Sequence, residues 1–266
     1  MRRSTARGPV TQGGIDPTGS GTIPRREGSR AARPAISLGA MRILLVPGLW
    51  LDGASWGGIP HALEAAGHTT ESLTMPGLGG ASDLGIADWV AAVVERIDAA
   101  PDPVVLVGHS GGGNVVWGAA DARPERVARV VFVDTIPPAD GFGISGFDVV
   151  DGAVPFPGWN AFNAPDIADL DESLRAHIEA GARSVPPGVT TDPIALANPA
   201  RFRIPVTLLM GSTDAEELAA SLAEWPVFAE EFRQIEQVEV VVIGSGHWPQ
   251  FSRPERLAEL LVAAAR

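Results

Sequence analysis

Residues 108–112, GHSGG, have the composition of a nucleophile turn, because Ser110 lies between small residues in the pattern G-x-S-x-G. The chain holds 31 glycines, so the pattern alone is weak evidence. Its surroundings strengthen it, since the β-forming run 104–107 precedes it and the helix-compatible stretch 114–122 follows. This order predicts a strained turn that lifts the Ser110 hydroxyl above a sheet edge.

A serine hydroxyl is a weak nucleophile and needs a base to accept its proton. His247 is the candidate base, because it directly follows an apolar run and the carboxyl ends of parallel strands meet at one edge. The other four histidines are interpreted as structural or surface residues: His61 and His68 near the first helix, His109 pointing away from Ser110, and His177 on a polar helix.

A carboxylate should orient the imidazole and stabilise its charged form. Asp214 and Asp134 both follow predicted strands, so both should reach the edge that carries Ser110. We favour Asp214, which gives the chain order Ser, Asp, His, and interpret Asp134 as a cap or brace. Asp134 remains the alternative acid, and Glu216 and Glu217 are weaker alternatives.

Acyl transfer also requires hydrogen-bond donors for the developing oxyanion. The backbone N–H of Gly111 should be one donor, because it follows the nucleophile directly. The N–H of Leu49, after the Pro47-Gly48 turn, is predicted to be the second. Each such donor is worth on the order of 3 kcal/mol in the transition state.

The elements that must position these residues alternate in the manner of βαβ units, which predicts a mostly parallel sheet covered on both faces. Strands are expected at 42–46, 69–74, 104–107, 127–133, 204–210 and 238–243, and helices at 54–66, 86–97, 114–122, 215–233 and 253–265. Residues 137–203 lack strong strands and hold one polar helix, about 167–182. They are too long for a simple crossover and predict a lid inserted into a core of 41–136 and 204–266.

Residues 1–40 carry seven arginines against Asp16 and Glu27, a net charge of +5. They are rich in Gly, Pro, Ser and Thr, which predicts a disordered extension, and we hypothesise that Met41 is the natural start. The whole chain is −12, so the remainder is −17. That acidity argues against nucleic acid and anionic membranes as partners.

Residue types that are missing exclude several chemistries. The chain has no lysine, which rules out a lysine base or Schiff base, and no cysteine, which rules out disulfides and thiolate metal sites. No clustered metal ligands and no G-x-G-x-x-G after a strand are present, so no metal or nucleotide cofactor is expected. The absence of cysteine fits a cytoplasmic location.

Three motifs together, Gly108-His109-Ser110-Gly111-Gly112, Gly211-x-x-Asp214 and Gly246-His247, resemble the α/β-hydrolase superfamily over residues 41–266. The chain is most similar to small bacterial esterase-like members, and distantly to plant methyl esterases and hydroxynitrile lyases. Those relatives often have His-Gly where this chain has Pro47-Gly48. The lyases use a lysine near the catalytic histidine, and this chain has no lysine. Epoxide hydrolases and haloalkane dehalogenases have an aspartate in the place of Ser110. None of these three activities is therefore expected here.

The resemblance implies a doubly wound sheet with a helical lid, and a serine hydrolase that forms an acyl-enzyme from a small, largely apolar ester, thioester or lactone. Trp50 and Trp248 are expected to bind substrate, with the lid aromatics Phe142, Phe147, Phe156 and Trp159 lining the pocket. Cofactor-free perhydrolase or haloperoxidase chemistry and a low-turnover ligand-binding protein are the alternatives. Oligomeric state is left open.

Overall fold

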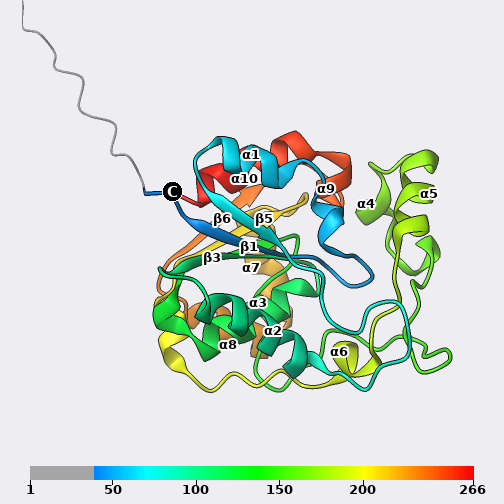
Figure 1. Cartoon of the computed structure of the whole chain (residues 1–266), viewed down its shortest axis with the longest axis horizontal. Coiled ribbons are helices and arrows are strands. Elements are labelled where there is room, and N and C mark those ends of the chain that lie inside the picture. The colour runs from blue at the N-terminus through cyan, green and yellow to red at the C-terminus, as the bar shows by residue number, and fades with distance from the viewer. Residues whose placement is uncertain (1–38) are drawn as a thin grey trace, which may run out of the picture. The chain divides into compact units, whose positions relative to one another are not determined.

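The computed structural model describes residues 39–266, so the predicted extension 1–40 and the hypothesis about Met41 as the start fall almost wholly outside the described part. Within that part, one parallel sheet has the order β2-β1-β3-β4-β5-β6 (Figure 1). Its strands are β1 (Arg42–Val46), β2 (Thr69–Ser72), β3 (Val104–His109), β4 (Val127–Val133), β5 (Val206–Met210) and β6 (Val238–Val242). The predicted parallel α/β fold is therefore confirmed.

Helices cover both faces of the sheet, as Figure 1 shows. One face packs against α1 (Ile59–Ala65) and α10 (Pro254–Ala264), and the other against α2 (Ile86–Asp98), α3 (Gly112–Ala122), α7 (Ala215–Glu224) and α8 (Pro226–Gln234). Side chains alternate between these faces along each strand: Ile43 and Leu45 point to the first cluster, Leu44 and Val46 to the second. Because both faces are buried, the central strands are largely apolar.

A proline and a glycine divide two helices that the sequence pattern predicts as continuous. The helix predicted at 215–233 is split at Pro226, because proline lacks an N–H and clashes with the preceding turn. The one predicted at 54–66 becomes the 3-10 turn η1 (Gly53–Trp56) and α1, with Gly57 at φ 53° between them. The one predicted at 253–265 is α10, and the short helix α9 (Pro249–Ser252) precedes it.

The segment between β4 and β5 is helical and irregular. It contains η3 (Trp159–Ala161), α4 (Ala164–Ile167), α5 (Glu172–Gly181), α6 (Pro187–Thr191) and η4 (Pro199–Arg203), and only isolated β-bridges, Val150–Ala153 and Val154–Val185. The predicted polar helix 167–182 is mainly α5. Figure 1 places α4 beside α9, near the carboxyl ends of the strands, so this segment borders the edge where Ser110 lies.

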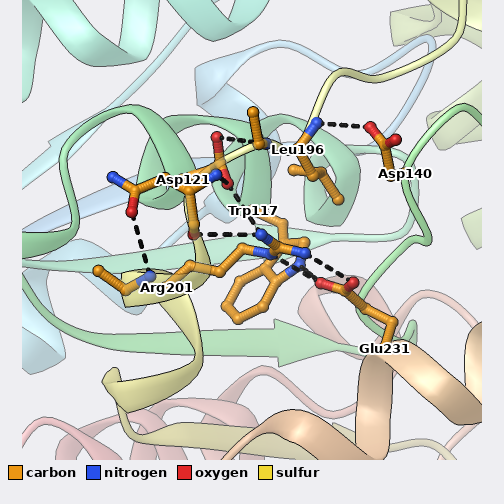
Figure 2. A network of polar contacts seen from close by, with 9 residues as sticks. Trp117, Asp121, Asp140, Leu196, Arg201 and Glu231 are labelled. Atoms are coloured by element: carbon orange, nitrogen blue, oxygen red, sulfur yellow. Dashed lines mark hydrogen bonds and ion pairs between the residues drawn. The ribbon is translucent and has the colours of Figure 1, made fainter.

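A buried ionic network fixes the return of this segment to the core (Figure 2). The Arg201 guanidinium donates to both carboxylate oxygens of Glu231, each at 2.8 Å, and to Asp121 Oδ1 at 3.1 Å. Trp117 Nε1 donates to Glu231 at 2.7 Å. The Asp121 carboxylate also accepts the N–H groups of Ala197 and Asn198. The network thus links α3 and α8 to the 3-10 turn η4, which directly precedes β5.

Candidate active site

The turn after β3 has the strained geometry that the motif predicts. Ser110 has φ 49°, a left-handed conformation that costs a non-glycine residue on the order of 1–3 kcal/mol. Gly108 and Gly112 permit it, because a Cβ at Gly108 would lie 2.6 Å from the Gly112 oxygen. A Cβ at Gly112 would lie 2.7 Å from the Val46 oxygen. Only glycine allows strand and helix to approach this closely.

His247 reaches Ser110 from the loop that follows β6. Its Nε2 lies 2.8 Å from the Ser110 hydroxyl oxygen, a hydrogen-bond distance. The loop is held against the end of β5, since the N–H groups of Gly244 and Ser245 both donate to the Gly211 carbonyl. The two residues named as nucleophile and base are therefore in direct contact.

Asp134, at the end of β4, lies on the other side of the imidazole. Its Oδ2 is 2.6 Å from His247 Nδ1, and its Oδ1 accepts the Gly211 N–H at 2.7 Å. Burial raises the pKa of Asp134, but its hydrogen bond to His247 and the nearby charge outweigh burial and hold the pKa below its usual value. Asp134 also has a positive φ, 46°, so two members of this chain of hydrogen bonds occupy strained backbone.

The preference for Asp214 as the partner of His247 does not fit this geometry. Asp214 is exposed, and its Oδ1 accepts the N–H groups of Glu216 and Glu217 as the N-cap of α7. Glu217 returns a hydrogen bond to the Asp214 N–H, which completes a capping box. The spacing Asp214-x-x-Glu217 before an apolar helix is itself a capping signature, and it identifies this role from sequence.

Two backbone N–H groups lie free beside Ser110. Those of Leu49 and Gly111 donate to no other group within residues 39–266. The Leu49 side chain and Ile144 cover Gly111, where a Cβ would lie 2.9 Å from Leu49 Cγ and 3.2 Å from Ile144 Cδ1. Unpaired donors at a sheltered turn suit a developing negative charge.

His109 takes part in the site, although the sequence interpretation set it aside. Its Nε2 lies 2.7 Å from the His247 carbonyl oxygen, and Gln250 Nε2 lies 3.3 Å from its Nδ1. The carbonyl accepts, so Nε2 carries the hydrogen and Nδ1 accepts from Gln250. Burial, with a smaller contribution from His247, lowers the pKa of His109 to about 3, so this ring is neutral at pH 7. It tethers the His247 backbone.

The turn between α4 and α5 holds the same loop from the other side. The Asp166 carbonyl accepts the His247 N–H at 2.8 Å, and Asp169 Oδ2 accepts the Gly246 N–H at 2.8 Å. A Cβ at Gly246 would lie 2.5 Å from Asp169 Oδ1, so the contact depends on glycine. The segment 137–203 thus contributes directly to the position of His247.

A cavity of about 360 Å³ opens beside Ser110. Its wall is mostly apolar, with two polar side chains besides that of Ser110, and consists of Ser110, Gly111, Asn114, Thr135, Ile136, Pro138, Gly143, Ile144, Trp225 and Phe228. Such a small, largely apolar hollow next to a reactive hydroxyl suits a small organic molecule. Asn114, Thr135 and Trp225 were not recognised from sequence.

Trp50 and Trp248, expected to bind substrate, do not line this cavity. Both are buried in an aromatic cluster that also contains Phe147, Phe156, Trp159 and Phe162. Trp50 has φ 64°, directly after Leu49, and the Trp248 ring lies edge-on to His247 with centroids 4.8 Å apart. The cluster supports the two loops on which the site depends. Phe142 packs on Phe228, at the cavity wall, with centroids 5.2 Å apart.

The remaining histidines lie away from Ser110. His61 and His177 are exposed, as expected. His68 is buried instead of surface-exposed, and its Nδ1 accepts the Met41 N–H at 3.3 Å at the start of β1. Residues 39–266 contain no group of three or more histidines and carboxylates placed to hold a metal ion. No helix among them is both long and apolar enough to span a bilayer.

The chain is similar in sequence to known proteins. The model of the Alpha/beta hydrolase family matches residues 43–260. The carbendazim-hydrolysing esterase of Nocardioides sp. (strain SG-4G) is 33% identical over 104 residues, which are 37% of this chain and 43% of the esterase. Lipase LipV of Mycobacterium tuberculosis is 33% identical over 125 residues, 45% of this chain and 46% of the lipase. The chain thus spans less than half the length of these two curated relatives.

Among solved structures, an extracellular alpha/beta-hydrolase from a Paenibacillus species superposes with a TM-score of 0.68. It is 20% identical, and the match covers 85% of this chain and 99% of that one. The pyrethroid hydrolase PytH gives a TM-score of 0.62 at 21% identity, with 85% and 98% covered. At these identities the likeness concerns the fold.

Proposed function

Because the chain belongs to the alpha/beta hydrolase family, we propose that it is a serine hydrolase that cleaves a small, largely apolar carboxylic ester, thioester or lactone. The observation that carries the proposal is the continuous hydrogen-bonded series from Asp134 through His247 to Ser110. In such a series the imidazole can accept the hydroxyl proton while the carboxylate stabilises the resulting imidazolium.

In the first half of the reaction, Ser110 Oγ attacks the substrate carbonyl carbon and His247 Nε2 accepts the Ser110 proton. The carbonyl oxygen becomes an oxyanion, to which the N–H groups of Leu49 and Gly111 donate. The bond to the leaving alcohol then breaks, and His247 returns the proton to that oxygen. The product is an ester of Ser110 with the acyl group.

In the second half, His247 removes a proton from water, which attacks the acyl carbon. The same oxyanion donors serve again, and the Ser110 oxygen leaves with the proton from His247. A carboxylic acid is released and the site is restored. Each step uses only protein groups and water.

The segment 137–203 is proposed to act as the lid of this site. Its Gly143 and Ile144 line the cavity, and its Asp166 and Asp169 hold the loop of His247. The segment therefore bounds the substrate and orders the base at the same time. One of the two curated relatives is named an esterase and the other a lipase, which is consistent with an ester substrate.

Labelling with a fluorophosphonate probe tests the proposal, because the probe reacts only with an activated serine. We expect wild-type protein to be labelled at Ser110, and Ser110→Ala and His247→Ala to remain unlabelled while keeping wild-type circular dichroism. A series of p-nitrophenyl esters, thioesters and lactones then identifies the class. A folded wild type that neither labels nor hydrolyses any of them would refute a hydrolase function.

A further inference from the structure

We propose that Asn114 is a specificity-determining residue that hydrogen-bonds a polar substituent on the acyl part of the substrate. The inference rests on the proposed function and adds a substrate class to it: esters whose acyl chain carries a hydroxyl or carbonyl group near the scissile bond. Thr135 supplies a second polar side chain on the same wall.

Asn114 is a buried polar side chain that the protein itself does not satisfy. It is 9% exposed and lies in the first turn of α3, four residues after Ser110. Its side-chain amide makes no hydrogen bond within residues 39–266, and its polar atoms are not among the fully enclosed ones of that part of the chain. The amide therefore keeps its donors and its acceptor free for a molecule that enters the adjoining cavity.

The space that the amide reaches is the cavity beside Ser110. Asn114 lines it together with Ser110 and Gly111, and Thr135 lines it from the strand end that follows Asp134. Thr135 is half-buried, and its hydroxyl also has no hydrogen-bond partner among residues 39–266. Two unsatisfied polar side chains therefore share a small cavity with the nucleophile.

The other side chains of the wall are apolar or aromatic: Ile136, Pro138, Ile144, Trp225 and Phe228. A purely hydrocarbon acyl chain would leave Asn114 unpaired in this setting, and the loss of its contact with water would oppose binding. An acyl chain with one hydroxyl or carbonyl group would satisfy the amide while its carbon atoms contact the apolar residues. A small number of placed polar groups in an apolar pocket is how such sites select ligands.

The cavity is assigned to the acyl part because of where the proton donor lies. The leaving alcohol must take its proton from His247, and His247 is not part of this cavity wall. Gly111, whose N–H faces the oxyanion, is part of it. Asn114 is one helical turn from Ser110, so the polar atom that it recognises should be within a few bonds of the carbonyl carbon.

The test compares two substrates with the same leaving group, p-nitrophenyl butyrate and p-nitrophenyl 3-hydroxybutyrate, each enantiomer of the latter separately. We expect wild type to show a higher kcat/KM for at least one hydroxy ester. Asn114→Leu, which keeps the shape and removes the amide, should lower that preference about tenfold, the loss expected for one hydrogen bond. Asn114→Ala should lower it as well and serves if the leucine variant does not fold.

Asn160→Leu is the matched control, because Asn160 is exposed and makes no side-chain hydrogen bond in the described chain. It should keep the wild-type preference. A wild type without preference, or a folded Asn114→Leu that retains it, would overturn the inference while leaving hydrolysis intact. Absence of both fluorophosphonate labelling at Ser110 and butyrate hydrolysis would instead remove the proposed function, and the inference with it.

Discussion

Two regions of this molecule bury charged groups, and they do so in opposite ways. Around Arg201, the carboxylates of Glu231 and Asp121 meet a permanently charged guanidinium that is 5% exposed (Figure 2). Around His247, the carboxylate of Asp134 meets an imidazole whose other nitrogen contacts the Ser110 hydroxyl. The first arrangement holds three elements together, whereas the second can accept a proton from Ser110.

The two regions also differ in the conformation of their backbone. Ser110 and Asp134 have positive φ angles, while Asp121, Arg201 and Glu231 lie in or beside regular helices. Backbone strain at the sheet edge persists only where neighbouring residues fix the conformation. Here the close packing at Gly108, Gly112 and Gly211 does so. Of the residues compared, those with strained backbone are the nucleophile candidate Ser110 and Asp134, and none of them belongs to the Arg201 network.

The largest expected effect concerns Asp134. Asp134→Asn should reduce kcat/KM on a p-nitrophenyl ester about 10⁴-fold, because an amide cannot stabilise the imidazolium and favours the wrong tautomer. Asp214→Ala, the matched carboxylate removal, should cost about 1 kcal/mol of stability through the lost cap and leave kcat/KM near wild type. A large rate loss in Asp214→Ala with little in Asp134→Asn would reverse the assignment.

The next largest effect concerns the contribution of the Arg201 network to stability. Glu231→Gln should lower the free energy of unfolding by about 3–5 kcal/mol, because it breaks the buried two-point ion pair with Arg201 and leaves Asp121 as the one carboxylate beside that charge. Urea denaturation followed by circular dichroism measures it, and kcat/KM per folded molecule should stay near the wild-type value. Arg233→Gln, at an exposed ion pair with Glu230, is the control and should change stability by less than about 1 kcal/mol. Equal effects of the two variants would show that burial of the network contributes nothing.

The smallest expected effect concerns the dependence of stability on pH. His109 has a folded-state pKa of about 3, so between about pH 6.5 and pH 3 the unfolded chain binds a proton that the folded chain does not. Stability should therefore fall with decreasing pH, with His109 contributing about 1.4 kcal/mol per pH unit. Urea midpoints at pH 6 and pH 4.5 measure this fall. His109→Gln should show a shallower one; identical slopes would mean that His109 is protonated in the folded protein.

Much of the site is local in sequence and was predictable for that reason. The turn around Ser110 combines a strand, a helix and two glycines within about 20 residues, so its geometry follows from neighbouring residues. His247 is identified because it follows a strand, and the ends of parallel strands meet at one edge. The alternation of apolar runs likewise determines the strands, although Pro226 divides a helix that periodicity joins.

What sequence could not decide depends on which side chains meet across the sheet edge. Asp134 and Asp214 both follow strands; only the tertiary structure brings Asp134 to His247 and leaves Asp214 on the cap of α7. The same holds for the contacts of His109 and Asp169 with the histidine loop and for the cavity wall formed by Asn114 and Trp225. These partners are up to 138 residues apart along the chain. Local propensity determines the elements, whereas contacts at that separation depend on how the loops pack over the completed sheet.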